Sequence, residues 1–250
     1  MAFLSKGHAS ASDINPNLDL HTMTTLIPHI ELVTGANPKG TVIWMHGLGA
    51  DCWDFVPIVK ELNLPAALPL RFIFPQAPMR PITINNGQVM PGWYDISMQD
   101  IARKPDEIGV RESQAAIDEL IERELNRDIA SDKIILAGFS QGGAIALQAG
   151  LRSKHELGGI MALSTYLTLG DALAKEKTIA NANIPILMAH GTQDPIVPLA
   201  LAKSSRDVLT QQNYQVEWRE YSMQHSVCAD EVAAISMWMT KRFASKILLA

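Results

Sequence analysis

The sequence predicts an α/β fold in which a mostly parallel central sheet is flanked by helices on both faces. From about residue 28 onward, apolar runs alternate with helix-like segments, and several of the runs are continuously apolar. Alternating strands and helices favour a parallel sheet. A strand that is apolar along its whole length is typical of a sheet covered on both faces. At 250 residues, the chain is long enough for one substantial core.

The predicted elements follow one another along the chain. Strands are expected over residues 30–34, 41–46, 70–74, 133–139, 159–163, 184–190 and 215–221. Helices are expected over residues 55–62, 107–126, 142–152, 199–212 and 229–244. The second of these helices is the clearest, because its apolar residues recur near one face: Ala115, Ile117, Leu120, Ile121 and Leu125.

One segment, residues 75–105, interrupts this alternation. It is dense in Pro, Gly and Asn, and Asn86-Gly87 within it predicts a hairpin turn. A long excursion of this kind inside a compact domain is usually functional. No repeat or break in composition divides the chain, so we expect a single domain over residues 26–250. Residues 1–25, rich in Ser, Asn, Thr and Asp, are expected to form a flexible leader.

The composition excludes several classes of function. A net charge of −5 without a Lys/Arg cluster argues against nucleic-acid binding. No run approaches membrane-spanning length, and the N-terminus lacks the apolar core of an export signal. Cys52 and Cys228 are too few for a disulfide scaffold, so we expect reduced thiols in a cytoplasmic protein. Neither metal-ligand spacings nor a phosphate or dinucleotide loop occurs, so no metal and no cofactor are expected.

The strongest chemical signal is Gly138-Phe139-Ser140-Gln141-Gly142, which lies between a predicted strand and a predicted helix. In a Gly-x-Ser-x-Gly turn the glycines relieve crowding, so the serine hydroxyl is exposed above the sheet. The turn also brings the first helix amides beside that hydroxyl, where they can stabilise negative charge. The context therefore predicts that Ser140 is a nucleophile rather than a structural serine.

A serine nucleophile needs a base, and the base needs a group that orients it. In hydrolases of this topology the acid and then the histidine follow the serine on loops after later strands. Asp194 and His225 occupy such positions and are predicted to be the acid and the base. His46 and His190 each end a strand and are expected to bond to neighbouring loops instead. The competing acids fall in segments of helical or strand character rather than on loops after later strands: Asp171, Asp207 and Glu217.

An oxyanion hole needs two backbone amides. One is expected from Gln141, the residue after the nucleophile, and the other from Leu48 in the loop after an early strand.

With these residues assembled, the chain resembles the carboxylesterase and acyl-protein thioesterase branch of the α/β hydrolases over about residues 38–244. The resemblance rests on six segments, which start at His46, Phe74, Trp93, Gly138, His190 and His225. It implies an α/β-hydrolase fold and a Ser140–His225–Asp194 triad, with the Leu48 and Gln141 amides as the oxyanion hole. It also implies that the segment around Trp93 borders the acyl site, although Trp93 can equally be a core aromatic. A homodimer is a further guess from the resemblance.

The function expected first is a serine carboxylesterase acting on short- to medium-chain acyl esters, with a small-molecule or lipid-like substrate. The alternative is an acyl-protein thioesterase or lysophospholipase with a long-chain apolar channel. Met90 and Trp93, with Ile96 and Met98, are the residues that could line such a channel, or they belong to the core. Cys52-Trp53, in the loop beside Leu48, is bulkier than the pair expected at that place. A bulkier loop could narrow or reshape the acyl entrance, so the substrate length stays open. A ligand-binding protein that kept the fold but lost turnover is the alternative of another class, although no member of the triad is missing.

Overall fold

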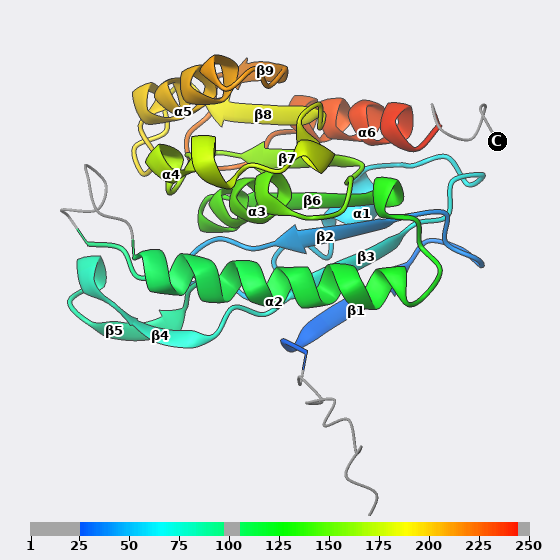
Figure 1. Cartoon of the computed structure of the whole chain (residues 1–250), viewed down its shortest axis with the longest axis horizontal. Helices are drawn as coiled ribbons and strands as arrows, with labels where there is room; N and C mark the ends of the chain where they lie inside the picture. The colour runs from blue at the N-terminus through cyan, green and yellow to red at the C-terminus, as the bar shows by residue number, and fades with distance from the viewer. Residues whose placement is uncertain (1–25, 98–105, 245–250) are drawn as a thin grey trace, which may run out of the picture.

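A seven-stranded sheet forms the centre of the computed structural model, which describes residues 26–97 and 106–244 (Figure 1). The strand order is β1-β3-β2-β6-β7-β8-β9. The strands are β1 His29–Val33, β2 Thr41–Met45, β3 Arg71–Pro75, β6 Ile134–Phe139, β7 Gly159–Leu163, β8 Ile186–Gly191 and β9 Val216–Tyr221. All neighbours pair in parallel except β1, which runs antiparallel to β3 at one edge. The mostly parallel sheet expected from the sequence is confirmed.

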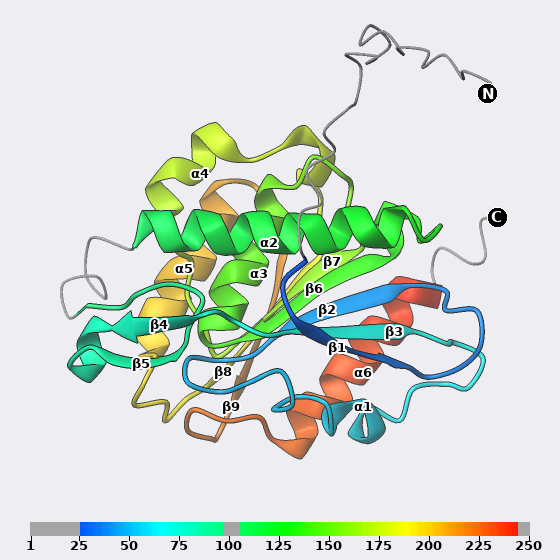
Figure 2. The ribbon, with the colours of Figure 1, turned by 90° about the horizontal axis from the view of Figure 1, so that it is seen from below.

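Helices cover both faces of this sheet. Four of them, α2 Glu107–Leu125, α3 Gln141–Arg152, α4 Gly170–Glu176 and α5 Leu199–Gln211, lie on one side, and α1 Ile58–Glu61 and α6 Ala229–Ala244 lie on the other (Figure 2). A hydrophobic core lies on each face of the sheet, and the strands contribute side chains to both cores because their side chains alternate between the faces. On β2, Ile43 and Met45 pack with α2 and α3, whereas Val42 and Trp44 pack with α1 and α6.

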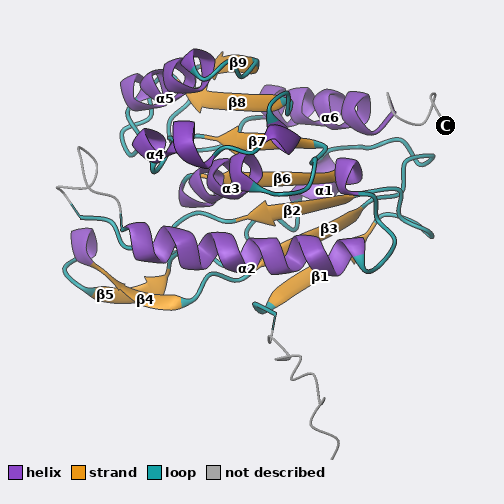
Figure 3. Ribbon diagram, in the orientation of Figure 1, coloured by secondary structure: helices purple, strands orange, loops and turns teal. Residues whose placement is uncertain are grey.

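The excursion after β3 contains the predicted hairpin. Strands β4 Met79–Ile82 and β5 Gln88–Pro91 pair antiparallel, separate from the main sheet (Figure 3). The turn includes the short 3-10 helix Thr83–Asn85, and both Asn86 and Gly87 have positive φ. The first helix after the excursion, α2, is capped by Asp106, whose side chain accepts a hydrogen bond from the Gly109 amide at 3.0 Å.

Two expectations about helices differ from the structure. The helix expected over 55–62 is only the four-residue α1, because the chain before it runs through successive turns up to Pro57. Helix α4 was not expected; it buries Leu173 alone, so it carries no apolar period. The expected leader, residues 1–25, lies outside the described residues. Within the part of the chain that is described, no helix is long and apolar enough to cross a membrane.

A buried carboxylate ties α2 to the sheet. Glu124 is fully buried near the end of α2 and accepts hydrogen bonds from Thr41 Oγ1 on β2 at 2.7 Å and from the Arg71 guanidinium on β3. Arg127 adds a third bond at 3.2 Å. Such a group stabilises the fold only while every partner is present, since removing one leaves an uncompensated charge in the interior.

We therefore expect Glu124→Ala to lower the free energy of unfolding by about 3 kcal/mol, because among the described residues Arg71 then keeps Glu31 alone as an acidic partner. Urea unfolding at neutral pH measures the change. The matched control is Glu112→Ala on the same helix, where an exposed carboxylate lies 3.8 Å from Arg80; its removal should cost less than about 1 kcal/mol. Equal losses for the two variants would contradict this role of Glu124.

Candidate active site

Ser140 stands at the junction of β6 and α3 with a backbone conformation that few residues adopt. Its φ is 54° and its ψ is −122°. Strain of this kind persists only where the surroundings enforce it. Here the Ser140 amide donates to the Leu163 carbonyl on β7 at 2.8 Å, and the Ser140 carbonyl accepts from Thr165 Oγ1 at 2.6 Å. The serine is thus bonded to the neighbouring strand β7 through its amide and to the loop after β7 through its carbonyl.

Close backbone approach explains the two glycines that flank the serine. A Cβ on Gly138 would lie 2.5 Å from the Gly143 nitrogen, and a Cβ on Gly142 would lie 2.6 Å from the His46 carbonyl oxygen. Real Cβ atoms do not come so near to backbone, so only glycine allows this turn to close against β2. The same packing brings the loop after β2 to the serine, since a Cβ on Gly47 would be 3.5 Å from Ser140 Cβ.

Asp194 and His225 meet as the sequence predicts. Their loops follow β8 and β9, and His225 Nδ1 lies 2.7 Å from Asp194 Oδ2. The other carboxylate oxygen of Asp194 accepts from the amides of Ile196 and Val197 at 2.8 and 2.9 Å. A carboxylate can only accept, so Nδ1 of His225 carries the proton and Nε2 is left as the basic nitrogen. The Phe139 ring, one residue before the serine, contacts the His225 ring with centroids 4.6 Å apart.

His46 and His190 bond to neighbouring loops, as expected. His46 Nδ1 bonds to the Gly47 carbonyl at 2.7 Å and its Nε2 accepts from the Ala77 amide at 3.1 Å, so both ring nitrogens are occupied. His190 Nε2 bonds to the Val197 carbonyl at 2.8 Å. Burial lowers the pKa of each imidazole, which favours the neutral ring.

The two residues predicted to supply oxyanion amides come from different segments of the chain. Gln141 is the first residue of α3, and the amides of the first helical turn have no partner inside the helix. Leu48 lies in the loop after β2, where its side chain would be 3.1 Å from a Cβ on Gly92. The next amide, that of Gly49, donates to the Pro91 carbonyl at 2.9 Å. The segment after β5 therefore supports the Leu48 loop.

The side chain of Gln141 has a role that the sequence did not reveal. Its Oε1 accepts from the Trp93 amide at 2.7 Å and its Nε2 donates to the Tyr94 carbonyl at 2.6 Å. The Trp93 indole donates to the His46 carbonyl at 2.8 Å. Three segments distant in sequence are thereby joined: the serine turn, the loop after β2 and the part of the excursion that follows β5. Residue spacing in the sequence does not predict these contacts of Gln141, because they depend on which loops meet in space.

The residues suggested for substrate binding fall into different environments. Trp93 is fully buried and bonded to backbone, so of the two readings left open by the sequence the structure favours the core aromatic. Met90 is half-buried, with its sulfur 3.5 Å from where a Cβ on Gly49 would lie. Ile96 packs at the margin of the core. Met98 lies outside the described residues.

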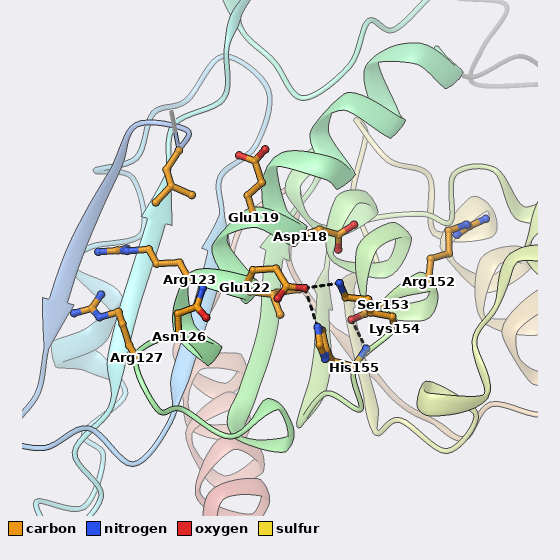
Figure 4. Close-up of a pocket in the computed structure, with 12 residues that line it drawn as sticks. Asp118, Glu119, Glu122, Arg123, Asn126, Arg127, Arg152, Ser153, Lys154 and His155 are labelled. Carbon is orange, nitrogen blue, oxygen red and sulfur yellow. Dashed lines mark hydrogen bonds and ion pairs between the residues drawn. The ribbon is translucent and has the colours of Figure 1, made fainter. Parts of the chain in front are cut away.

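A pocket of about 780 Å³ opens elsewhere, between α2 and the end of α3 (Figure 4). Within it Glu122 pairs with Lys154 and with His155, each at 2.8 Å. Burial raises the pKa of the neighbouring Asp118 to about 6. Ser140, Asp194 and His225 do not line this pocket, so we do not associate it with the serine chemistry. Among the described residues, no group of three or more His, Cys, Asp or Glu side chains is arranged to hold a metal ion.

The fold and this arrangement define the class of protein: an α/β hydrolase. A family model described as Phospholipase/Carboxylesterase matches residues 29–242, and the chain belongs to that family of ester hydrolases. An acyl-protein thioesterase 1 from Neurospora crassa is 41% identical over 216 residues, covering 83% of this chain and 88% of that protein. One from Gibberella zeae is 37% identical, covering 82% and 92%.

Solved structures agree with this assignment. The crystal structure of Zea mays acyl-protein thioesterase 2 has a TM-score of 0.77 and 25% identity, covering 87% of this chain and 99% of that one. That of Arabidopsis thaliana SOBER1 has a TM-score of 0.76 and 27% identity, covering 81% and 98%.

Glu231 is a buried acid near the histidine loop that the sequence did not single out. It lies in the first turn of α6, six residues after His225, and is fully buried. Burial raises its pKa from 4.5 to about 8, so the folded protein keeps this carboxyl protonated at neutral pH. The unfolded chain releases that proton near pH 4.5. Between pH 4.5 and about pH 8 the unfolded state binds fewer protons at Glu231 than the folded state does. The contribution of Glu231 to stability therefore falls as pH rises through this range.

We therefore expect Glu231→Gln, which removes the titration and keeps the shape, to gain stability relative to the wild type as pH rises. The difference in free energy of unfolding should grow by up to about 3 kcal/mol between pH 5 and pH 7. Urea unfolding of both proteins across that range measures it. A difference that stays constant, or one that shrinks with rising pH, would show that Glu231 is ionised in the folded protein.

Proposed function

We propose that this chain is an acyl-protein thioesterase that uses Ser140, His225 and Asp194 as a catalytic triad. One structural observation carries the chemistry: His225, bonded to Asp194, packs against the ring of Phe139, the residue directly before a serine whose strained turn is enforced by close backbone contacts. The two relatives named acyl-protein thioesterase 1, 41% and 37% identical over most of both chains, support the thioester as the bond that is cleaved.

The reaction starts with attack of Ser140 Oγ on the acyl carbonyl carbon, while Nε2 of His225 takes the hydroxyl proton. Asp194 holds the imidazole in the required tautomer and stabilises the imidazolium that forms. The amides of Leu48 and Gln141 stabilise the negative charge that develops on the carbonyl oxygen. Loss of one such donor typically costs about a hundred- to a thousandfold in rate.

The tetrahedral intermediate then collapses and breaks the bond to sulfur. His225 gives its proton to the departing thiol, and the acyl group remains on Ser140 as an ester. A water molecule attacks this ester with His225 again as the base, which releases the fatty acid and restores the serine. All proton transfers pass through one imidazole, and apart from Ser140, which loses and regains its hydroxyl proton, no other group of the chain is required to change its protonation.

Hydrolysis of short- to medium-chain oxyesters, the function that the sequence suggested first, is the second candidate. It is favoured by the family description, which includes carboxylesterases. The named relatives favour the thioesterase over it.

Both cysteines are free thiols, in agreement with the proposal of a cytoplasmic protein.

The test is kcat/KM on oxyesters from acetyl to palmitoyl, measured alongside an S-palmitoylated peptide, with Ser140→Ala as the blank. We expect efficiency to rise with acyl length, rapid cleavage of the thioester, and no turnover by the Ser140→Ala protein in a folded state. A maximum at short chains with slow thioester cleavage would replace the thioesterase with a general carboxylesterase. Undiminished activity of Ser140→Ala would overturn the triad itself.

A further inference from the structure

A row of aromatic rings leads from the core of the sheet to the imidazole of His225. Trp44 on β2 stacks on Phe55 with centroids 5.4 Å apart, and Phe55 lies 5.7 Å from Phe139. Phe139 lies 4.6 Å from His225, with the two ring planes inclined by 46°. The row therefore joins the buried strand β2, the loop after it, the end of β6 and the loop after β9.

We propose that Phe139 is a positioning residue for the hydrolytic reaction, which holds the His225 imidazole in its working orientation by packing against the ring. This inference rests on the proposed Ser140–His225–Asp194 mechanism. It adds that the residue before the nucleophile acts through the base and not through the substrate. Phe55 also contacts the Phe139 ring, with centroids 5.7 Å apart.

The imidazole needs such support because the hydrogen bond from Nδ1 to Asp194 fixes a single point of the ring. A ring held at one atom can still swing about that bond, which moves Nε2 relative to the serine. His225 is half-buried on a loop between β9 and α6, so its backbone alone gives limited restraint. A second contact on the ring removes the swing. Displacements of about 1 Å at a reacting group can cost on the order of a hundredfold in rate.

Phe139 itself is firmly placed. It is the last residue of β6 and pairs with Leu163 on β7 within the parallel sheet. Its ring lies beside the loop after β2, since a Cβ on Gly47 would be 3.4 Å from Phe139 Cδ1. The ring is therefore confined between the loop that carries Leu48 and the loop that carries His225.

The charged groups around this contact belong to other elements. Asp194 bonds His225 from the loop after β8, and His190 lies behind it, 3.4 Å from Asp194 Oδ2. On the loop that carries Phe55, the carboxylates of Asp51 and Asp54 act on His46. Phe139 adds no charge to the site, so replacing it with leucine tests packing without changing this electrostatic environment.

The experiment compares three variants of the full chain on p-nitrophenyl butyrate. We expect Phe139→Leu to lower kcat by about 10- to 100-fold with KM changed by less than about twofold, because geometry at the base is lost while binding is kept. Phe139→Tyr, which keeps the ring, should retain most of the activity. The matched control is Phe72→Leu: Phe72 belongs to the same core and stacks on Phe74 at 6.2 Å on β3, so it should lower Tm while kcat is kept.

A double-mutant cycle shows whether the effect passes through His225. In a His225→Ala background, Phe139→Leu should leave the residual rate unchanged, because the group that it positions is gone. If Phe139→Leu does not fold, Phe55→Leu enters the same cycle with a smaller expected loss. An equal loss in both backgrounds, or full kcat for folded Phe139→Leu, would overturn the proposal. An active Ser140→Ala protein would instead overturn the mechanism on which the proposal rests, so the two failures are distinguishable.

Discussion

The tight turn at Ser140 is the constraint on which the rest of the site depends. The backbone of α3 passes so close to β2 and β6 that a single extra carbon at Gly138 or Gly142 would overlap neighbouring backbone. The serine is consequently held at φ 54° and ψ −122°, which costs free energy that the surrounding sheet must offset. Because this approach also brings the loop after β2 to the serine, the nucleophile and the expected oxyanion loop are positioned by one packing contact.

The site is completed from both sides by contacts between loops at the carboxyl edge of the sheet. On one side, Asp194 orients His225, and the aromatic ring of Phe139 packs against that imidazole. On the other side, the Gln141 side chain binds the backbone at Trp93, whose indole in turn bonds to the His46 carbonyl. The polar side chains of Asp194, Gln141 and Trp93 each have a defined partner, which keeps the loops in one arrangement and holds the expected oxyanion amides in place.

The sequence predicted the sheet well, since continuous apolar runs mark strands that helices cover on both faces; each of the seven strands lies within two residues of its expected bounds. The pairing of Asp194 with His225 followed from their places after later strands. Helix α4 escaped prediction because it buries a single apolar residue and so has no helical apolar period. The shortness of α1 escaped it because the residues before Pro57 form successive turns. The contacts made by Gln141, Phe139 and Trp93 escaped it for another reason: they join segments far apart in the chain, and residue spacing alone does not show which loops meet.

The most direct test of the central claim, that this turn presents an activated serine, is covalent labelling with a fluorophosphonate followed by mass-spectrometric mapping of the modified peptide. The account predicts a single adduct on Ser140, no adduct in Ser140→Ala, and much slower labelling in His225→Ala, since the hydroxyl then lacks its base. An adduct at another residue, or an active protein in which Ser140 stays unmodified, would contradict it.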